Sequence, residues 1–153
     1  MLKTVINRTG IEPQKLELEV TESVVQSNLL GLKVFSELKA LGVGLAIDDF
    51  GTGYSSFASL KDLSVDCLKI DKYFTDGILS DSDSKYLVSS MIDIGRNLGY
   101  ETIVEGVEKP EQINVLKDLG CKVVQGDVFS KPVNANELLH ILERGSLLAK
   151  TRE

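Results

Sequence analysis

The sequence has 153 residues, 42% of them hydrophobic and 26% charged, a balance typical of one soluble globular domain spanning residues 1–153. Its 23 acidic and 17 basic residues give a net charge of −6, which disfavours a protein that binds the backbone of a long nucleic acid. No apolar run approaches the roughly 20 residues of a membrane span and no signal peptide opens the chain, so we expect a cytoplasmic protein.

Five short segments with the character of strands alternate with helical stretches. The first, residues 15–20, alternates charged and apolar side chains. Four further apolar runs, each long enough for one buried strand, end at Asp48, Ile70, Glu105 and Gln125. Strands that alternate with helices predict a parallel sheet with helices packed outside it.

The helical stretches carry apolar stripes that we interpret as faces packed on the core. Three of the helix-to-strand junctions contain Leu-Gly, and glycine there closes a helix in the left-handed conformation. The stripes are Leu30, Val34, Phe35, Leu38 and Leu41; then Leu87, Met91, Ile94 and Leu98; then Ile113, Leu116 and Leu119; and last Leu138, Leu139 and Leu142.

All five predicted strands bring a polar residue to their carboxyl-terminal end. In parallel α/β folds the loops at this end converge and hold the chemistry. Solvated loops also begin there, so one such residue would mean little, but a polar residue on every strand favours a site. The candidates are Glu19, Asp48, Asp49, Lys69, Glu105 and Gln125.

The carboxylates in this set are hard oxygen donors whose charges would repel one another unless cations lay between them. The two cysteines, Cys67 and Cys121, form no CxxC pair and no His cluster accompanies them, so we expect buried thiols and neither a zinc site nor a disulfide framework. Oxygen ligands favour Mg²⁺ or Mn²⁺. With Lys69 as a cation for phosphate, the set is compatible with metal-assisted phosphoester hydrolysis, and equally with a barrel that metabolises sugars or carboxylates.

A glycine-rich stretch, residues 49–56, follows the aspartate pair. Two glycines and small hydroxyl residues make a backbone that can approach a ligand closely. A plain turn from strand to helix explains the same composition, but the position directly after Asp48 and Asp49 favours a functional loop.

Five segments in order resemble the motifs of one family. Residues 16–23, 48–56, 68–71, 105–108 and 125–132 are similar to the fourth-strand motif, the aspartate pair with its loop, the lysine motif, the seventh-strand motif and the last strand with its loop of the EAL domain. The resemblance covers nearly the whole chain. It implies a (β/α)₈-barrel phosphodiesterase of bacterial signalling, which opens cyclic di-GMP to the linear dinucleotide pGpG with two Mg²⁺ or Mn²⁺ ions.

The same resemblance implies a role for each candidate residue. Glu19, Asp48 and Asp49 would be metal ligands, and Glu105 would lie beside the metals and the attacking water as a ligand or a base. Lys69 would position the water or the phosphate. The remaining roles are substrate contact by Gln125, anchoring of the loop at residues 50–56 by Glu22, and support by Asp71 and Glu108.

The sequence also departs from the family. The tripeptide Glu-Ala-Leu for which the family is named does not occur, and no matching third-strand Asn is present. We therefore expect an incomplete barrel of about five parallel strands, the family's fourth to eighth, that is inactive by itself. A catalytically inactive module for binding cyclic di-GMP or another protein is the alternative. A homodimer, and upstream sensory or GGDEF-type domains in a longer protein, are the expected partners.

Overall fold

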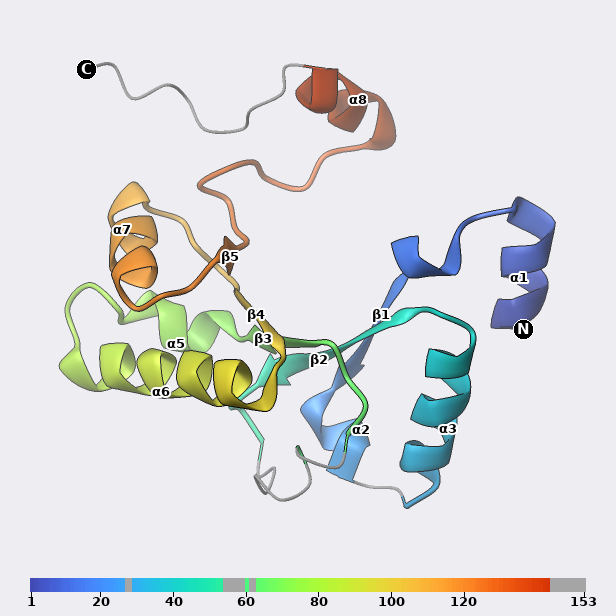
Figure 1. Cartoon of the computed structure of the whole chain (residues 1–153). Helices are drawn as coiled ribbons and strands as arrows, with labels where there is room; N and C mark the ends of the chain where they lie inside the picture. Colours follow the sequence, from blue (N-terminus) through green and yellow to red (C-terminus); the bar gives the residue numbers. More distant parts are fainter. Residues whose placement is uncertain (27–28, 54–59, 61–62, 144–153) are drawn as a thin grey trace.

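The structure, a computed structural model, describes residues 1–26, 29–53, 60 and 63–143, with only the backbone described at 25, 26 and 29–32 (Figure 1). One five-stranded sheet organises it, and its neighbouring strands are parallel throughout in the order β1-β2-β3-β4-β5. The predicted parallel sheet is confirmed. The strands are β1 (Glu17–Thr21), β2 (Gly44–Phe50), β3 (Cys67–Ile70), β4 (Glu101–Val104) and β5 (Val123–Val124).

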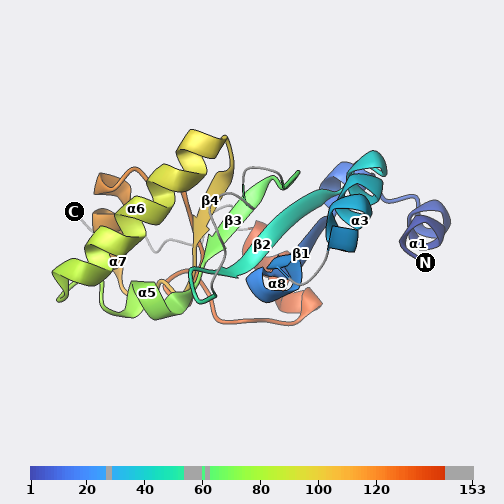
Figure 2. The same cartoon turned by 90° about the horizontal axis from the view of Figure 1, so that it is seen from below.

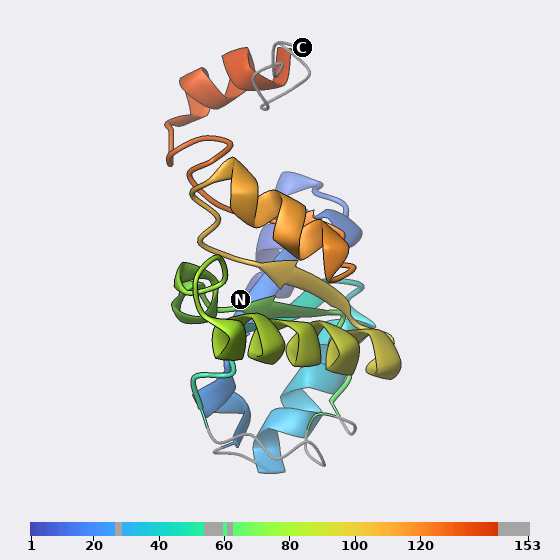
Figure 3. The same ribbon diagram turned by 90° about the vertical axis from the view of Figure 1, so that its left-hand side faces the viewer.

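Helices connect the strands. Seen from below (Figure 2), α3 and α6 lie along the same face of the sheet, whereas α8 stands apart on the other side (Figures 1 and 3). The helices are α1 (Leu2–Thr9), the 3-10 turn η1 (Pro13–Lys15), α2 (Glu22–Gln26), α3 (Leu29–Ala40), α5 (Lys72–Asp76), α6 (Ser82–Leu98), α7 (Pro110–Asp118) and α8 (Ala135–Glu143).

The hydrophobic core fills the space between the sheet and its covering helices. Alternate strand residues point to opposite faces, so the apolar residues of β2, β3 and β4 that face the helices are fully buried. Burial of each such side chain contributes about 1.5–3 kcal/mol. The main contributors are Leu45, Ile47, Leu68, Ile70 and Val104 from the strands and Phe35, Val88, Ile92 and Leu116 from the helices.

The junction glycines behave as predicted. Gly42, Gly99 and Gly120 have φ angles of 85°, 79° and 81°, a region in which other residues are strained. Each lets the chain turn sharply from a helix toward the next strand.

Two predicted stripes differ in part from the structure. On α6 the predicted Met91, Ile94 and Leu98 are partly buried and pack on the core, but the fully buried residues are Val88, Ile92 and Gly95, and the predicted Leu87 is 45% exposed. The small Gly95 sets this face, because it brings the helix backbone against Thr102 and Leu68. The stripe on α8 is exposed, since that helix does not pack on the core; its residues Leu138, Leu139 and Leu142 are 46%, 59% and 65% exposed.

The stripe predicted on α3 is only partly buried. Phe35 is buried but Val34 is 48% exposed, and the side chain of Leu30 lies outside the described part.

The two cysteines differ in burial. Cys67 is buried, and burial raises the pKa of its thiol to about 12. Cys121 is only half-buried, because it follows α7 at the sheet margin, where its thiol donates to the carbonyl of Val123 at 3.1 Å. Among the described helices, none combines the length and apolar character needed to cross a membrane.

The carboxylate of Asp66 joins three elements at the amino-terminal ends of the strands. It accepts hydrogen bonds from the Leu45 amide at 2.8 Å and from Lys39 Nζ at 2.6 and 2.7 Å. Burial alone would raise its pKa, but these bonds lower it below the usual value. Ionised Asp66 therefore stabilises the fold above its unfolded pKa, and this stabilisation is lost as pH falls through the folded pKa.

We expect Asp66→Asn to lower the free energy of unfolding by about 1–2 kcal/mol at pH 7, because it removes the charge that Lys39 and the Leu45 amide contact. The difference from the parent chain should begin to shrink below about pH 4, where Asp66 of the unfolded parent chain becomes protonated, and it should vanish as pH falls through the lowered folded pKa. Urea unfolding of both chains at pH 7 and at pH 3 measures this difference in the free energy of unfolding. An equal loss at pH 7 and pH 3 would contradict the assigned role.

Candidate functional site

The ammonium group of Lys69 lies at the centre of the predicted site. Its Nζ is 2.6 Å from Glu19 Oε1, 2.8 Å from Glu105 Oε1 and 3.5 Å from Asp48 Oδ1. These residues come from β3, β1, the end of β4 and β2, so the parallel register alone brings them together. The structure therefore gathers four of the predicted residues around one point.

Lys69 is 5% exposed, whereas the carboxylates around it reach solvent to different degrees. The side chains of Glu19, Asp48 and Glu105 are 49%, 26% and 17% exposed. Burial by itself would lower the pKa of Lys69, but hydrogen bonds to Glu105 and Glu19 raise it well above its usual value. Lys69 is therefore charged at neutral pH, and it compensates carboxylates that would otherwise repel one another.

A β-bulge in β2 places the aspartate pair. Ile47 pairs with Leu68 and Phe50 with Ile70, so β2 has one residue more than β3 between these pairs. Adjacent strand residues normally point to opposite faces, but the extra residue lets Phe50 return to the core while Asp48 and Asp49 both precede it at the strand end. Asp49 has a φ of 55°, the only positive φ among the described residues that are not glycine.

Strain of this kind collects where function constrains the backbone. Burial raises the pKa of Asp49, and the charges of Asp48 and Asp71 raise it further. Asp48 Oδ1 is buried and makes no hydrogen bond within the described structure, although Lys69 Nζ lies 3.5 Å away. A buried oxygen left without a donor fits a cation ligand, because an unpaired buried acceptor is otherwise costly.

Within the described ranges, no group of three or more His, Cys, Asp and Glu side chains is arranged to hold a metal ion. The reason is visible in the geometry: Glu19, Asp48 and Glu105 converge on the ammonium of Lys69 rather than on one another. The donor set nevertheless suits the hard cations Mg²⁺ and Mn²⁺, since every candidate ligand is a carboxylate.

Glu22 holds the start of the glycine-rich loop. It is the first residue of α2, is only 3% exposed, and its Oε2 accepts the amides of Gly51 at 2.9 Å and Gly53 at 3.2 Å. The loop immediately follows the bulge, so Glu22 connects α2 to the aspartate pair. Residues 54–56 of the predicted loop lie outside the described residues.

Gln125 and Glu105 line one hollow of about 370 Å³. The amide of Gln125 donates to Val104 and its carbonyl accepts from Val107, which places it beside the end of β4. The hollow is also lined by Lys72, Gly106, Glu108, Gly126 and Asp127. Gln125 thus lines the same hollow as Glu105, although no hydrogen bond or ion pair among the described residues joins its side chain to the Lys69 cluster.

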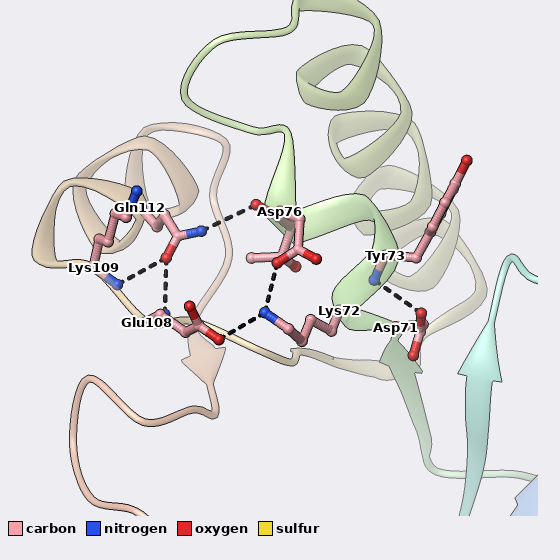
Figure 4. A network of polar contacts seen from close by, with 8 residues as sticks. Asp71, Lys72, Tyr73, Asp76, Glu108, Lys109 and Gln112 are labelled. Atoms are coloured by element: carbon pink, nitrogen blue, oxygen red, sulfur yellow. Dashed lines mark hydrogen bonds and ion pairs between the residues drawn. The ribbon is translucent and has the colours of Figure 1, made fainter.

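The two remaining predicted residues lie in a second polar network (Figure 4). Asp71 caps α5 by accepting the amide of Tyr73 at 2.9 Å. Glu108 accepts Lys72 Nζ at 2.7 Å, and Lys72 also contacts Asp76 at 2.6 Å. Lys72 and Gln112 were not predicted from the sequence, because each has the spacing of an ordinary helix residue and belongs to no recognised motif.

Comparison with known proteins gives the family. The sequence profile described as "EAL domain" matches residues 1–132. The signalling protein YkoW of Bacillus subtilis is 42% identical over 87% of this chain and 17% of its own length. The bifunctional diguanylate cyclase/cyclic di-GMP phosphodiesterase MucR of Pseudomonas aeruginosa is 41% identical over 90% of this chain and 20% of its own length. The chain thus spans about a fifth of these relatives.

Solved structures agree with the sequence comparison. The PaMucR phosphodiesterase in complex with c-di-GMP superposes with a TM-score of 0.86 at 40% identity, covering 90% of this chain and 56% of that one. Klebsiella pneumoniae BlrP1, in a complex with manganese and cyclic di-GMP, gives a TM-score of 0.80 at 32% identity over 86% of this chain and 34% of that one.

Replacement of Lys69 by Met should destabilise the chain by about 2 kcal/mol, because three carboxylates then face one another without the buried ammonium. Millimolar Mn²⁺ should recover much of the loss by supplying the missing positive charge. Thermal unfolding with and without Mn²⁺ measures both effects. The exposed Lys85→Met is the control and should respond to neither change. A Lys69→Met chain as stable as the parent would contradict the assigned role.

Proposed function

The chain belongs to the EAL-domain family, and we propose that it supplies the carboxyl-terminal part of a metal-dependent phosphodiesterase site that hydrolyses cyclic di-GMP to pGpG. The observation that carries the proposal is the convergence of Glu19, Asp48 and Glu105 on the buried Lys69. Similar chains bind the proposed substrate, as the PaMucR complex with c-di-GMP illustrates.

In this proposal Glu19, Asp48 and Asp49 hold Mg²⁺ or Mn²⁺, which when bound supplies Lewis acidity toward a phosphate and a bound water of lowered pKa. The manganese complex of BlrP1 supports this choice of metal. The features of this chain that support it are the Oδ1 of Asp48, which is buried and accepts no hydrogen bond, and the strained backbone of Asp49.

The other residues of the site would orient the substrate and activate the attacking water. Glu105, held 2.8 Å from Lys69, lies where it can accept a proton from an attacking water or contribute a further carboxylate ligand. Lys69 presents a fixed positive charge toward a phosphate oxygen or that water. Gln125 reaches the substrate from the neighbouring wall of the hollow, and Glu22 fixes the loop after the aspartate pair.

A module that binds cyclic di-GMP or a protein without catalysis is the second candidate function. Two observations favour it: the sequence contains no Glu-Ala-Leu tripeptide, and α8 exposes three leucines beside an apolar groove of about 680 Å³ along β4 and β5. Binding without turnover would support this candidate. The cytoplasmic location expected from the sequence remains a prediction.

Hydrolysis of cyclic di-GMP by this chain alone, with Mg²⁺ or Mn²⁺, should be absent or very weak, since the resemblance implies two metal ligands that this sequence does not supply. A chimera that adds the preceding strands of the MucR phosphodiesterase domain should hydrolyse it. In that chimera Glu105→Gln should reduce turnover by about a hundredfold or more while largely sparing the fold, because the amide keeps the shape and loses the charge.

Formation of pGpG by chromatography measures this prediction. Robust turnover by the unextended chain would contradict the first part of it. A chimera in which Glu105→Gln turns over as fast as the parent would remove Glu105 from the mechanism.

The second proposed partner is another copy of this chain. In the described sheet β1 pairs only with β2, and β5 only with β4, so two strand edges carry backbone groups that need partners or water. Val123 and Val124 also line the apolar groove beneath α8. A two-fold dimer that pairs the β5 edges of two copies would also cover this groove. The MucR name, which joins two activities, supports further domains in the whole protein.

We expect sedimentation at low micromolar concentration to show a dimer. Leu138→Lys on α8 should shift the chain toward monomer, because Leu138 lines the groove that the dimer would cover, whereas Tyr86→Lys on α6 should not. A cooperatively folded monomer of the unmutated chain at these concentrations would contradict the proposed assembly.

A further inference from the structure

A polar network behind Glu105 is not explained by the proposed reaction alone. The segment 105–109 follows β4 and is held from two sides, by α5 and by α7 (Figure 4). Lys72 of α5 places its Nζ 2.6 Å from Asp76 Oδ1 and 2.7 Å from Glu108 Oε1. The contacts with Asp76 and Glu108 raise the pKa of Lys72 above its usual value, so the bridge is charged at neutral pH.

The aliphatic stem of Lys72 lies directly on the backbone of Gly106. A Cβ at Gly106 would come within 2.3 Å of Lys72 Cγ, and its φ of 68° is in the left-handed region. The residue next to Glu105 is therefore shaped to receive this one side chain. Lys72 also lines the hollow that Glu105 and Gln125 share, so the network borders the site itself.

Gln112 holds the same segment from α7. It is 4% exposed, and its Oε1 accepts the amides of Glu108 and Lys109, both at 2.8 Å. Its Nε2 donates to the carbonyl of Thr75 in α5 at 3.0 Å. The Gln112–Thr75 bond is buried and the two bonds to the amides are partly buried, so loss of Gln112 leaves these groups without a partner.

We propose that Lys72 and Gln112 are positioning residues for Glu105: they fix the segment 105–108 against α5 so that the Glu105 carboxylate faces Lys69. The alternative is that the network merely adds stability to the fold. The two roles predict different effects of a substitution. Loss of a positioning residue loosens only its own segment, whereas loss of a general stabiliser loosens the whole sheet. The functional part of this inference rests on the proposed function, but its structural part does not.

The structural arm compares Lys72→Met, which keeps the stem over Gly106 and removes the charge, with the unmutated chain. Amide hydrogen exchange at Glu105 and Val107, whose amides donate to Ile70 and Gln125, should become about tenfold or more faster. Exchange at Leu68 in β3 should not change. Lys15→Met, which breaks the exposed Lys15–Glu12 pair of 2.8 Å, is the matched control and should leave all three amides unchanged.

Unchanged exchange in Lys72→Met, or acceleration that is equal at Leu68, would overturn the inference. A second pair of variants tests the same segment by a substitution that leaves the charge of Lys72 in place. Gly106→Ala should show the same local acceleration, whereas Gly99→Ala, at a similar φ of 79° but with no atom within 4 Å of its Cβ, should not.

The functional arm measures binding of cyclic di-GMP in the presence of Mn²⁺ by calorimetry. Lys72→Met should weaken it by about tenfold and Lys72→Arg should restore most of it, because Arg keeps the charge. In a Glu105→Gln background Lys72→Met should have no further effect, since the two act through one carboxylate. Additive losses would overturn the inference. If the unmutated chain does not bind, the proposed function fails for this chain, while the exchange arm still decides the positioning role.

Discussion

The buried ammonium of Lys69 is the constraint on which the site depends. A charge that is 5% exposed is stable only when opposite charges lie close to it, and three strand ends provide them at 2.6, 2.8 and 3.5 Å. Conversely, the carboxylates tolerate one another only because the ammonium lies among them. The parallel register of β1, β2, β3 and β4 is thereby tied to one electrostatic centre as well as to the hydrophobic core on the other face.

The bulge in β2 solves a second problem, that of two adjacent aspartates at one strand end. A regular strand would turn Asp49 toward the core, where a carboxylate is costly to bury. With the extra residue, Leu45, Ile47 and Phe50 all stay in the core. Asp49 lies within the bulge, where its backbone adopts the left-handed conformation. The strain of this conformation is local, and it is borne by a strand whose other residues are among the most deeply buried of the described chain.

The sheet could be predicted because its signals are local. Apolar runs of strand length and the repeated Leu-Gly junctions each depend on a few neighbouring residues. They predicted each strand of the described residues and the end of the sheet that carries Glu19, Lys69 and Glu105. What failed depended on three-dimensional context. On α6 the deepest burial lies one position beyond the predicted stripe because Gly95 permits close approach to Thr102, and the leucines of α8 are exposed because that helix does not pack on the core. Lys72 and Gln112 were missed because their partners lie 36 and 37 residues away in the chain.

The two ends of the sheet differ in how their charges are balanced. At the amino-terminal ends Asp66 has a cation and an amide within 2.8 Å, and its charge is fully used by the fold. At the carboxyl-terminal ends four carboxylates, those of Glu19, Asp48, Asp49 and Glu105, share the single ammonium of Lys69, and Asp48 Oδ1 remains without a hydrogen bond. Stability alone does not favour such an excess of negative charge, because each further carboxylate raises the repulsion. The unbalanced end is therefore the end at which the proposed function places a polyvalent cation, whose charge would offset this excess.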